Sequence, residues 1–272
     1  MFRSTLICLA TALAALVSLV AAAATAAGHH QQGTTMHWTI DGVRRDALVF
    51  APQATQRAAK HPLVIAFHGH GGRMLSTSVL MHIQTLWPQA IVVYPQGLNT
   101  PTVLDPTGTS PGWQGKARDL GDRDLKLFDE IVATMKRTYA VDKRRIYATG
   151  FSNGAVFSFL LWAERAKTIA AIGEVAGRLG PSETLTSARA LVAVAGRNDT
   201  VAPFAVQKQT IQQARQIDGA TGAGSPCGRY CTLYASTNGP VRVKTFIHPG
   251  GHVYPTWAPR EIVKFFKSHK QP

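Results

Sequence analysis

The stretch Gly150-Phe151-Ser152-Asn153-Gly154 is the strongest indication of the fold, because it places a serine between two glycines at a predicted strand-to-helix turn. A largely apolar run, 145–149, precedes it, and a second apolar run, 155–162, follows it. A sharp turn of this kind lifts the serine hydroxyl clear of the backbone, and the glycines leave no Cβ to crowd it. The following helix directs its N-terminal amides at any negative charge that forms beside the serine. The stretch therefore predicts a nucleophile elbow with Ser152 at its apex. The alternative is a serine in an ordinary turn.

Predicted strands and helices alternate along most of the chain. The strands cover 36–40, 47–50, 62–67, 90–94, 145–149, 169–175, 190–195 and 241–247, and the helices cover 122–140, 155–162, 205–217 and 259–267. The turn Asp41-Gly42 lies between the first two strands and favours an antiparallel hairpin. The turn-rich segment 96–112 is interpreted as a long loop over the sheet. Because the later strands alternate with helices, we expect a mostly parallel central sheet with helices on both faces. The length of 272 residues suits a single domain.

The first residues are typical of a leader that directs export. Arg3 is followed by a long run of alanine, leucine and valine, and the run ends in Ala24-Thr25-Ala26. A positive start, an apolar centre and small residues at the end together predict a secretory signal peptide over residues 1–27. A transmembrane anchor is the alternative, but the run is short for one and lacks a charged stop. We therefore expect a secreted or periplasmic protein, residues 28–272, with no stable membrane insertion after cleavage.

Two cysteines remain after the predicted leader, Cys227 and Cys231. Two thiols close together in an exported protein favour a disulfide bond. The closed loop is so small that loop-closure entropy would add only about 2 kcal/mol of stability. We expect this disulfide to hold a local turn rather than to support the fold.

The chain carries a formal net charge of +14, spread along the sequence rather than gathered in one block. Such a charge can favour anionic surfaces or acidic polysaccharide. Nucleic acid is the obvious alternative partner. However, the sequence has no helix-turn-helix, zinc-finger or aromatic RNA-binding pattern, so nucleic-acid binding is not expected.

A serine hydroxyl becomes a good nucleophile only when a base takes its proton, and the base needs an acid to orient it. In α/β-hydrolases the three groups follow in the order Ser, Asp or Glu, His, each on a loop after a strand. Asp199 follows the predicted strand 190–195, and His252 follows the predicted strand 241–247. The order and the placement predict an α/β-hydrolase catalytic domain with the triad Ser152, Asp199 and His252.

Each partner of Ser152 has an alternative explanation. Asp199 could cap the helix that starts near Pro203, and Asp218 is a rival acid, although it follows a helix rather than a strand. His248 is the rival base, at the edge of the predicted strand. His252 is favoured because it lies in a glycine-flanked loop that can bring the imidazole towards the serine.

The oxyanion hole is predicted from His68-Gly69-His70-Gly71-Gly72, which follows the strand 62–67. In this fold that segment supplies one backbone N–H, here that of His70, and the residue after the nucleophile, Asn153, supplies the other. A zinc site at His68 and His70 is the alternative, but no third ligand lies nearby. We therefore expect no metal and no organic cofactor.

Three aromatic residues near the predicted site are candidates for the wall of a substrate pocket: Trp113, Tyr254 and Trp257. Packing in the core is the alternative for each of them. For Trp87 and Trp162, on predicted helices, core packing is the expected role.

Further motifs run from about Arg44 to Trp257. They are His68-Gly69, Tyr94-Pro95-Gln96-Gly97-Leu98, Gly112-Trp113, the run from Asp142 to Tyr147 that leads into the serine turn, Asp199-Thr200-Val201-Ala202-Pro203 and Gly251-His252. With these motifs the chain resembles the polyhydroxybutyrate depolymerase-like esterases, which are related to the feruloyl and acetylxylan esterases of carbohydrate esterase family 1. Two positions depart from the family pattern. Gln96 stands where an aspartate is more usual, and Tyr254-Pro255-Thr256 replaces a Trp-Pro-Gly that often follows the histidine. Both departures bear on the acyl preference.

The resemblance implies an exported serine ester hydrolase that acts through an acyl-enzyme. The expected substrate is an ester on a polymer, either a polyhydroxybutyrate-type polyester or the feruloyl or acetyl esters of polysaccharide. Two other functions fit the same residues: a serine peptidase on the same fold, and a non-catalytic protein that binds polysaccharide or polyester. The sequence does not specify the oligomeric state.

Overall fold

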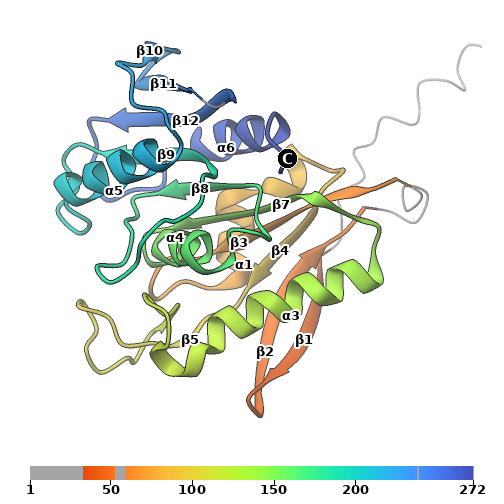
Figure 1. Cartoon of the computed structure of the whole chain (residues 1–272). Helices are drawn as coiled ribbons and strands as arrows, with labels where there is room; N and C mark the ends of the chain where they lie inside the picture. The colour runs from red at the N-terminus through yellow and green to blue at the C-terminus, as the bar shows by residue number, and fades with distance from the viewer. Residues whose placement is uncertain (1–32, 53–58, 238, 272) are drawn as a thin grey trace, which may run out of the picture. The chain divides into compact units, whose positions relative to one another are not determined.

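The computed structural model describes residues 33–52, 59–237 and 239–271, and these residues form a domain around one large sheet (Figure 1). The signal peptide predicted over residues 1–27 lies outside the described residues. Within the described ranges, no helix is both long and apolar enough to cross a bilayer.

The elements follow one another in this order along the chain. They are β1 (Thr34–Ile40), β2 (Val43–Phe50), β3 (His61–Phe67), α1 (Met74–Met81), α2 (Ile83–Leu86), β4 (Ile91–Pro95), β5 (Leu98–Asn99), β6 (Pro111–Gly112), a 3-10 helix (Asp119–Asp122), α3 (Arg123–Thr138), β7 (Val141–Phe151), α4 (Asn153–Arg165), β8 (Ala171–Val175), β9 (Ala190–Gly196), α5 (Phe204–Ile217), β10 (Ser225–Pro226), β11 (Cys231–Ser236), β12 (Gly239–His248) and α6 (Ala258–Lys267).

The sheet has ten strands in the order β1-β2-β4-β3-β7-β8-β9-β12-β11-β10. The strands from β4 to β12 in this order run parallel, and both edges of the sheet are antiparallel. Every residue of β3, β8 and β9 is buried, as expected for strands covered on both faces. The predicted mostly parallel sheet is confirmed. The antiparallel edge formed by β10 and β11 was not predicted.

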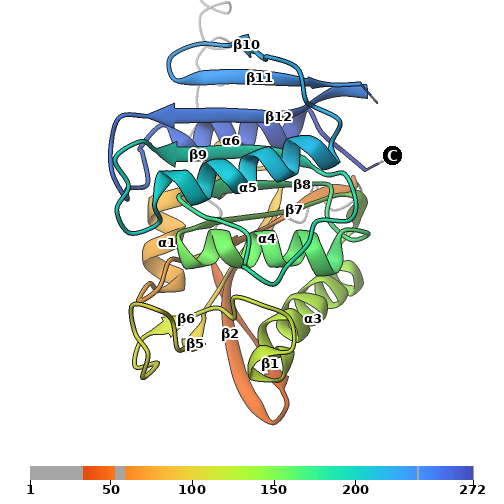
Figure 2. The same ribbon diagram turned by 60° about the vertical axis from the view of Figure 1, so that its left-hand side comes forward.

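Helices cover both faces of the sheet (Figures 1 and 2). The helices α3, α4 and α5 bury Ile131, Phe157 and Ile211 in the core of one face. The helices α1, α2 and α6 lie on the other face, where Ile262 and Phe266 of α6 are buried. A single domain with helices on both faces is therefore confirmed.

Two local predictions are also confirmed. Ile40 pairs with Val43 across the turn Asp41-Gly42, in which both residues have positive φ, 49° and 78°, as a two-residue hairpin turn requires. Cys227 and Cys231 form a disulfide, and the N–H of Cys227 donates to the carbonyl of Cys231 at 3.1 Å. This disulfide closes the turn between β10 and β11, so it acts locally.

A carboxyl group is buried in the middle of the sheet. Glu174 of β8 is fully buried, and its Oε2 accepts a hydrogen bond from the N–H of Gly177 at 2.9 Å. Its Oε1 has no partner among the described residues. Burial raises the pKa of Glu174 to about 8, and the hydrogen bond from Gly177 lowers it only in part. The side chain is therefore mainly protonated at neutral pH.

This carboxyl should make stability depend on pH. Between its usual pKa of 4.5 and about 8, the folded chain keeps a proton that the unfolded chain has lost. The free energy of unfolding should therefore fall as pH rises through this window, by on the order of 5 kcal/mol. Urea unfolding at pH 5 and at pH 8.5 measures the fall. Glu174→Gln, which cannot titrate, should show a smaller one, and an equal fall in both proteins would contradict the assignment.

Candidate active site

Ser152 lies in a strained turn between β7 and α4, with φ 54° and ψ −118°. Its backbone N–H donates to the carbonyl of Val175 at 2.9 Å, which holds the turn against β8. A Cβ on Gly150 would lie 2.3 Å from the carbonyl of Gly154, and one on Gly154 would lie 2.4 Å from the carbonyl oxygen of Phe67. Both positions therefore require glycine, and the turn has the form of a nucleophile elbow.

The three residues of the predicted triad lie together at the carboxyl ends of parallel strands. Ser152 follows β7, Asp199 follows β9 and His252 follows β12. The Nε2 of His252 lies 2.8 Å from the Oγ of Ser152, and its Nδ1 lies 2.8 Å from the Oδ2 of Asp199. The ring of Phe151 packs beside the imidazole, with 5.1 Å between ring centroids. This arrangement can pass a proton from the hydroxyl to the imidazole.

The carboxylate of Asp199 is held by four hydrogen bonds. Its Oδ1 accepts from the backbone N–H groups of Val201 and Ala202, at 2.9 and 2.8 Å. Its Oδ2 accepts from the Nε2 of Gln207 at 3.0 Å, in addition to the contact with His252. The helix α5 begins only at Phe204 and has no side-chain cap, so Asp199 does not cap it.

Gln207 was not identified from the sequence. It is fully buried on α5, on the face that also buries Ile211 and Ala214. A glutamine on the apolar face of an amphipathic helix, just after a candidate acid, is the signal that could have pointed to it. Gln207 bonds to Oδ2, the same oxygen of the Asp199 carboxylate that contacts His252.

The Oγ of Ser152 contacts His252, and among the described residues it makes no hydrogen bond to His248 or Asp218. The Nδ1 of His248 accepts from the N–H of Gly250 at 3.1 Å, and burial lowers the pKa of His248. Asp218 accepts from the backbone N–H of Arg189, the residue before β9, so it lies at the opposite end of the sheet.

The segment after β3 has the features of an oxyanion hole. Among the described residues, no acceptor is found for the backbone N–H of His70 or for that of Asn153. A Cβ on Gly69 would lie 3.5 Å from the Cβ of Ser152, so this backbone passes close to the serine. These two amides are the donors predicted from the sequence.

The two histidines of this segment have separate partners. The Nδ1–H of His68 donates to the carbonyl of Gly69 at 2.7 Å, and its Nε2 accepts from the N–H of Gly97 at 2.9 Å. Burial lowers the pKa of His68, which keeps the ring neutral. The Nε2 of His70 lies 3.0 Å from the Oδ2 of Asp105. Across the described part of the chain, no three metal-binding side chains gather at one point.

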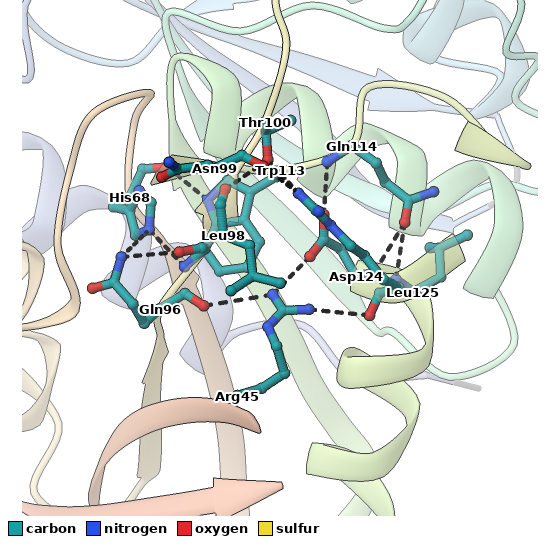
Figure 3. A network of polar contacts seen from close by, with 12 residues as sticks. Arg45, His68, Gln96, Leu98, Asn99, Thr100, Trp113, Gln114, Asp124 and Leu125 are labelled. Atoms are coloured by element: carbon teal, nitrogen blue, oxygen red, sulfur yellow. Dashed lines mark hydrogen bonds and ion pairs between the residues drawn. The ribbon is translucent and has the colours of Figure 1, made fainter. Parts of the chain in front are cut away.

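A buried polar network contacts His68 in the oxyanion segment, residues 68–72 (Figure 3). The Nη2 of Arg45 donates to the Oδ1 of Asp124 at 2.7 Å, and both side chains are completely buried. The Oδ2 of Asp124 accepts from the N–H of Gln114 at 2.8 Å. The Nε2 of Gln96 lies 3.3 Å from the Nε2 of His68, and the carbonyl of Gln96 accepts from Arg45. The network thus joins β2, α3 and the segment 96–114 to the oxyanion segment.

Trp113 links this network to the serine turn. Its backbone N–H donates to the Oδ1 of Asn153 at 2.7 Å, and its carbonyl accepts from the Nδ2 of Asn153 at 3.0 Å. Its indole Nε1 donates to the carbonyl of His68 at 2.9 Å, and its side chain is buried with 1% exposure. Trp113 therefore bonds both to Asn153 and to the segment after β3, which carry the two predicted oxyanion donors.

A cavity of about 320 Å³ opens beside Ser152. Its wall is formed by His70, Pro101, Thr102, Val103, Leu104, Trp113, Gly115, Lys116, Asp119, Ser152, Asn153, Val156, Ala176, Arg178, Gly180, Pro181, Val201 and Ala202. Val103 and Leu104 stand at its exposed rim, with 88% and 73% of their surface exposed. Tyr254 and Trp257 do not line it, since they pack edge-on against Phe151 and tilted against Phe246. The cavity suits a mainly apolar group next to the serine.

No family model matches the chain. The chain is 26% identical over 237 residues to a probable feruloyl esterase C of Aspergillus clavatus. The match spans 82% of this chain and 83% of that protein. It is 29% identical over 138 residues to a bifunctional acetylxylan esterase/xylanase of Neocallimastix patriciarum, and the match spans 50% of this chain but only 18% of that larger protein. Among solved structures, the acetyl xylan esterase from Aspergillus awamori matches with a TM-score of 0.62 and 14% identity, over 86% of this chain and 99% of that one. This structural likeness supports the α/β-hydrolase fold.

Proposed function

Since the chain is an α/β-hydrolase related to feruloyl esterases, we propose that it hydrolyses carboxylic esters with Ser152 as the nucleophile. The observation that carries the proposal is the pair of 2.8 Å contacts that joins the Ser152 hydroxyl, the His252 imidazole and the Asp199 carboxylate. Ser152 also lines a cavity of about 320 Å³, which is large enough for an acyl group.

The reaction follows from this geometry. The Oγ of Ser152 attacks the ester carbonyl while the Nε2 of His252 takes its proton, and Asp199 holds the imidazole with its proton on Nδ1. The backbone N–H groups of His70 and Asn153 stabilise the negative oxygen of the tetrahedral intermediate. His252 then gives the proton to the leaving alcohol, which produces the acyl-enzyme. The same histidine deprotonates a water molecule that releases the acid and restores the serine.

We place the substrate among the esters of polysaccharides, with feruloyl or acetyl groups as the acyl part. The named activities of the curated relatives support this choice over polyhydroxybutyrate-type polyester. The mainly apolar wall beside Ser152 supports an acyl group of this size.

A hydrolysis panel tests the substrate class. It contains methyl ferulate, acetylated xylan, a short nitrophenyl ester, polyhydroxybutyrate and an amide matched to the best ester. We expect the feruloyl or acetyl ester to have the highest kcat/KM and the amide to be hydrolysed far more slowly. Faster turnover of polyhydroxybutyrate would overturn the substrate class, and amide hydrolysis at the ester's rate would favour a peptidase.

Export is part of the proposal. The leader-like sequence of residues 1–27 and the disulfide between Cys227 and Cys231 both suit an oxidising compartment outside the cytosol. N-terminal sequencing of the exported protein tests the cleavage site. A mature chain that starts near residue 28 is expected, and retention of the full leader in the cytosol would contradict export.

Gln207 should act as a positioning residue for the triad. Replacing it by methionine removes the 3.0 Å hydrogen bond to Asp199 but keeps the volume of the side chain. A hydrogen bond to a charged group contributes about 1.5–3 kcal/mol, so kcat should fall roughly 10- to 100-fold. KM should stay the same, because Gln207 does not line the cavity.

The exposed Gln213 of the same helix provides the matched control, Gln213→Met. This variant should keep the wild-type kcat. The rate at which a fluorophosphonate labels Ser152 should fall in parallel with kcat in Gln207→Met. A rise in KM with an unchanged kcat would rule out the positioning role.

A further inference from the structure

A second cavity lies at the end of the sheet opposite the triad. It has a volume of about 330 Å³, and its wall includes Arg144, Arg189, Arg242 and the C-terminal segment 268–271. Arg144 is near the start of β7, Arg189 precedes β9 and Arg242 is near the start of β12. The triad follows the other ends of the same strands. Since a strand rises about 3.3 Å per residue, roughly 20 Å of sheet separates the two cavities.

The wall of this cavity is strongly basic. Arg144, Arg189, Arg242 and Lys270 are cationic, and the rest of the wall is formed by three alanines together with Ser268, His269 and Gln271. Across the described residues, no carboxylate lies within 4.0 Å of the charged nitrogens of these four side chains. Burial lowers the pKa of Arg189, the positive charge of Arg242 lowers it further, and the carboxyl of Asp218 raises it in part. Arg189 and Arg242 therefore repel each other. An anion in the cavity would relieve this repulsion.

Two acids contact these arginines, and both do so through the backbone. The Oδ1 of Asp142 accepts from the N–H of Arg144 at 3.0 Å. Asp218 accepts a hydrogen bond from the backbone N–H of Arg189 at 2.8 Å. Its Oδ2 is buried without a hydrogen-bond partner among the described residues. Burial raises the pKa of Asp218 to about 7, although the N–H of Arg189 and the charge of Arg242 lower it. At neutral pH this carboxyl is therefore only partly ionised.

Hydrogen bonds to backbone carbonyls hold Arg144 and Arg189, and all three arginines keep N–H groups that bond to no described residue. The Nε of Arg144 donates to the carbonyl of Gln271 at 2.8 Å, which leaves both of its Nη groups without a partner in the described structure. Arg189 donates from Nε and Nη1 to the carbonyls of Ala166 and Ala188. Arg242 makes no hydrogen bond through its side chain to any described residue. The free Nη1 and Nη2 groups of Arg144 offer two parallel N–H donors, which match two oxygens of an oxyanion.

We propose that this basic cavity, defined by Arg144, Arg189, Arg242 and Lys270, binds a polyvalent oxyanion of the phosphate or sulfate class. A divalent group offsets more of the clustered positive charge than a single carboxylate does, and each of its oxygens can accept from a different cation. The cavity has room for one such group and an attached sugar ring. A bound oxyanion joins the C-terminal segment to the starts of three strands, so binding stabilises the fold. The proposal does not depend on the esterase function.

Equilibrium dialysis and thermal unfolding of the whole protein test it. We expect one inorganic phosphate per chain and a saturable rise in Tm of roughly 3–6 °C at ten times Kd, beyond the effect of sodium chloride at equal ionic strength. Arg242→Gln should weaken phosphate binding at least 10-fold while leaving ester hydrolysis unchanged. The matched control is Arg260→Gln, which removes the same charge from an exposed position on α6 and should bind as the wild type does.

The outcomes separate the possibilities. A rise in Tm that chloride reproduces, or that is the same in Arg242→Gln and Arg260→Gln, would overturn the proposal. Saturable binding that only Arg242→Gln loses supports it. Glucose 6-phosphate then identifies the source: tighter binding than inorganic phosphate points to an esterified group on a sugar, and equal or weaker binding points to the free ion.

Discussion

Replacing Ser152 by alanine is expected to lower kcat for a nitrophenyl ester by roughly three to six orders of magnitude. The variant loses the atom that attacks the carbonyl, while the amides of His70 and Asn153 and the cavity stay in place. KM should therefore change little, and the fold should be intact. The measurement is steady-state hydrolysis together with circular dichroism of the purified protein.

A control and a chemical probe make this result specific. Ser76→Ala changes an exposed serine on α1 and should keep full activity. A fluorophosphonate should label the wild type and Ser76→Ala at one site but leave Ser152→Ala unlabelled. Hydrolysis by Ser152→Ala at the wild-type rate would sink the proposed mechanism.

The largest loss of stability is expected from Asp124→Ala. This change leaves the buried guanidinium of Arg45 without its carboxylate partner, since both side chains have 0% exposure. Breaking a buried pair by removing one partner costs about 3–5 kcal/mol. It also frees the N–H of Gln114, so the segment that carries Trp113 should loosen and kcat should fall. Urea unfolding measures the first effect.

A surface pair provides the comparison. Asp129 and Arg165 lie 2.9 Å apart, and the side chain of Asp129 is 46% exposed. Asp129→Ala should therefore cost at most about 1 kcal/mol. The double variant Arg45→Met, Asp124→Leu should recover most of the stability lost in Asp124→Ala, because it buries no unpaired charge. Equal losses in Asp124→Ala and Asp129→Ala would show that the buried pair has no special role.

The sheet and the nucleophile elbow could be predicted from the sequence because the patterns that indicate them lie within short stretches of the chain. Strands buried on both faces, such as β3 and β9, appear as continuous apolar runs. The helix α1 gave no such signal, since it exposes Leu75 and Val79 and has no clear apolar face. The two-residue strand β10 is too short for any pattern.

The supporting residues of the site could not be read in this way. Arg45 and Asp124 are 79 positions apart in the chain, and Trp113 and Asn153 are 40 apart. No local spacing predicts such pairs. Tyr254 and Trp257 follow His252 closely in the sequence, which suggested that they line the cavity. In the structure they pack against Phe151 and Phe246 instead.

The parallel sheet, the serine turn and the order of the residues that follow the strands could all be predicted from the sequence. The sheet is indicated by the periodicity of apolar residues, and the serine turn by glycines where the backbone passes too close to other atoms for a Cβ. Both signals lie within short stretches of sequence. The tertiary structure alone decided which nitrogen of His252 faces Ser152, that Gln207 supports Asp199, and that arginines from three strands share one cavity. Those contacts join residues that are distant along the chain, and they exist only once the strands have packed side by side.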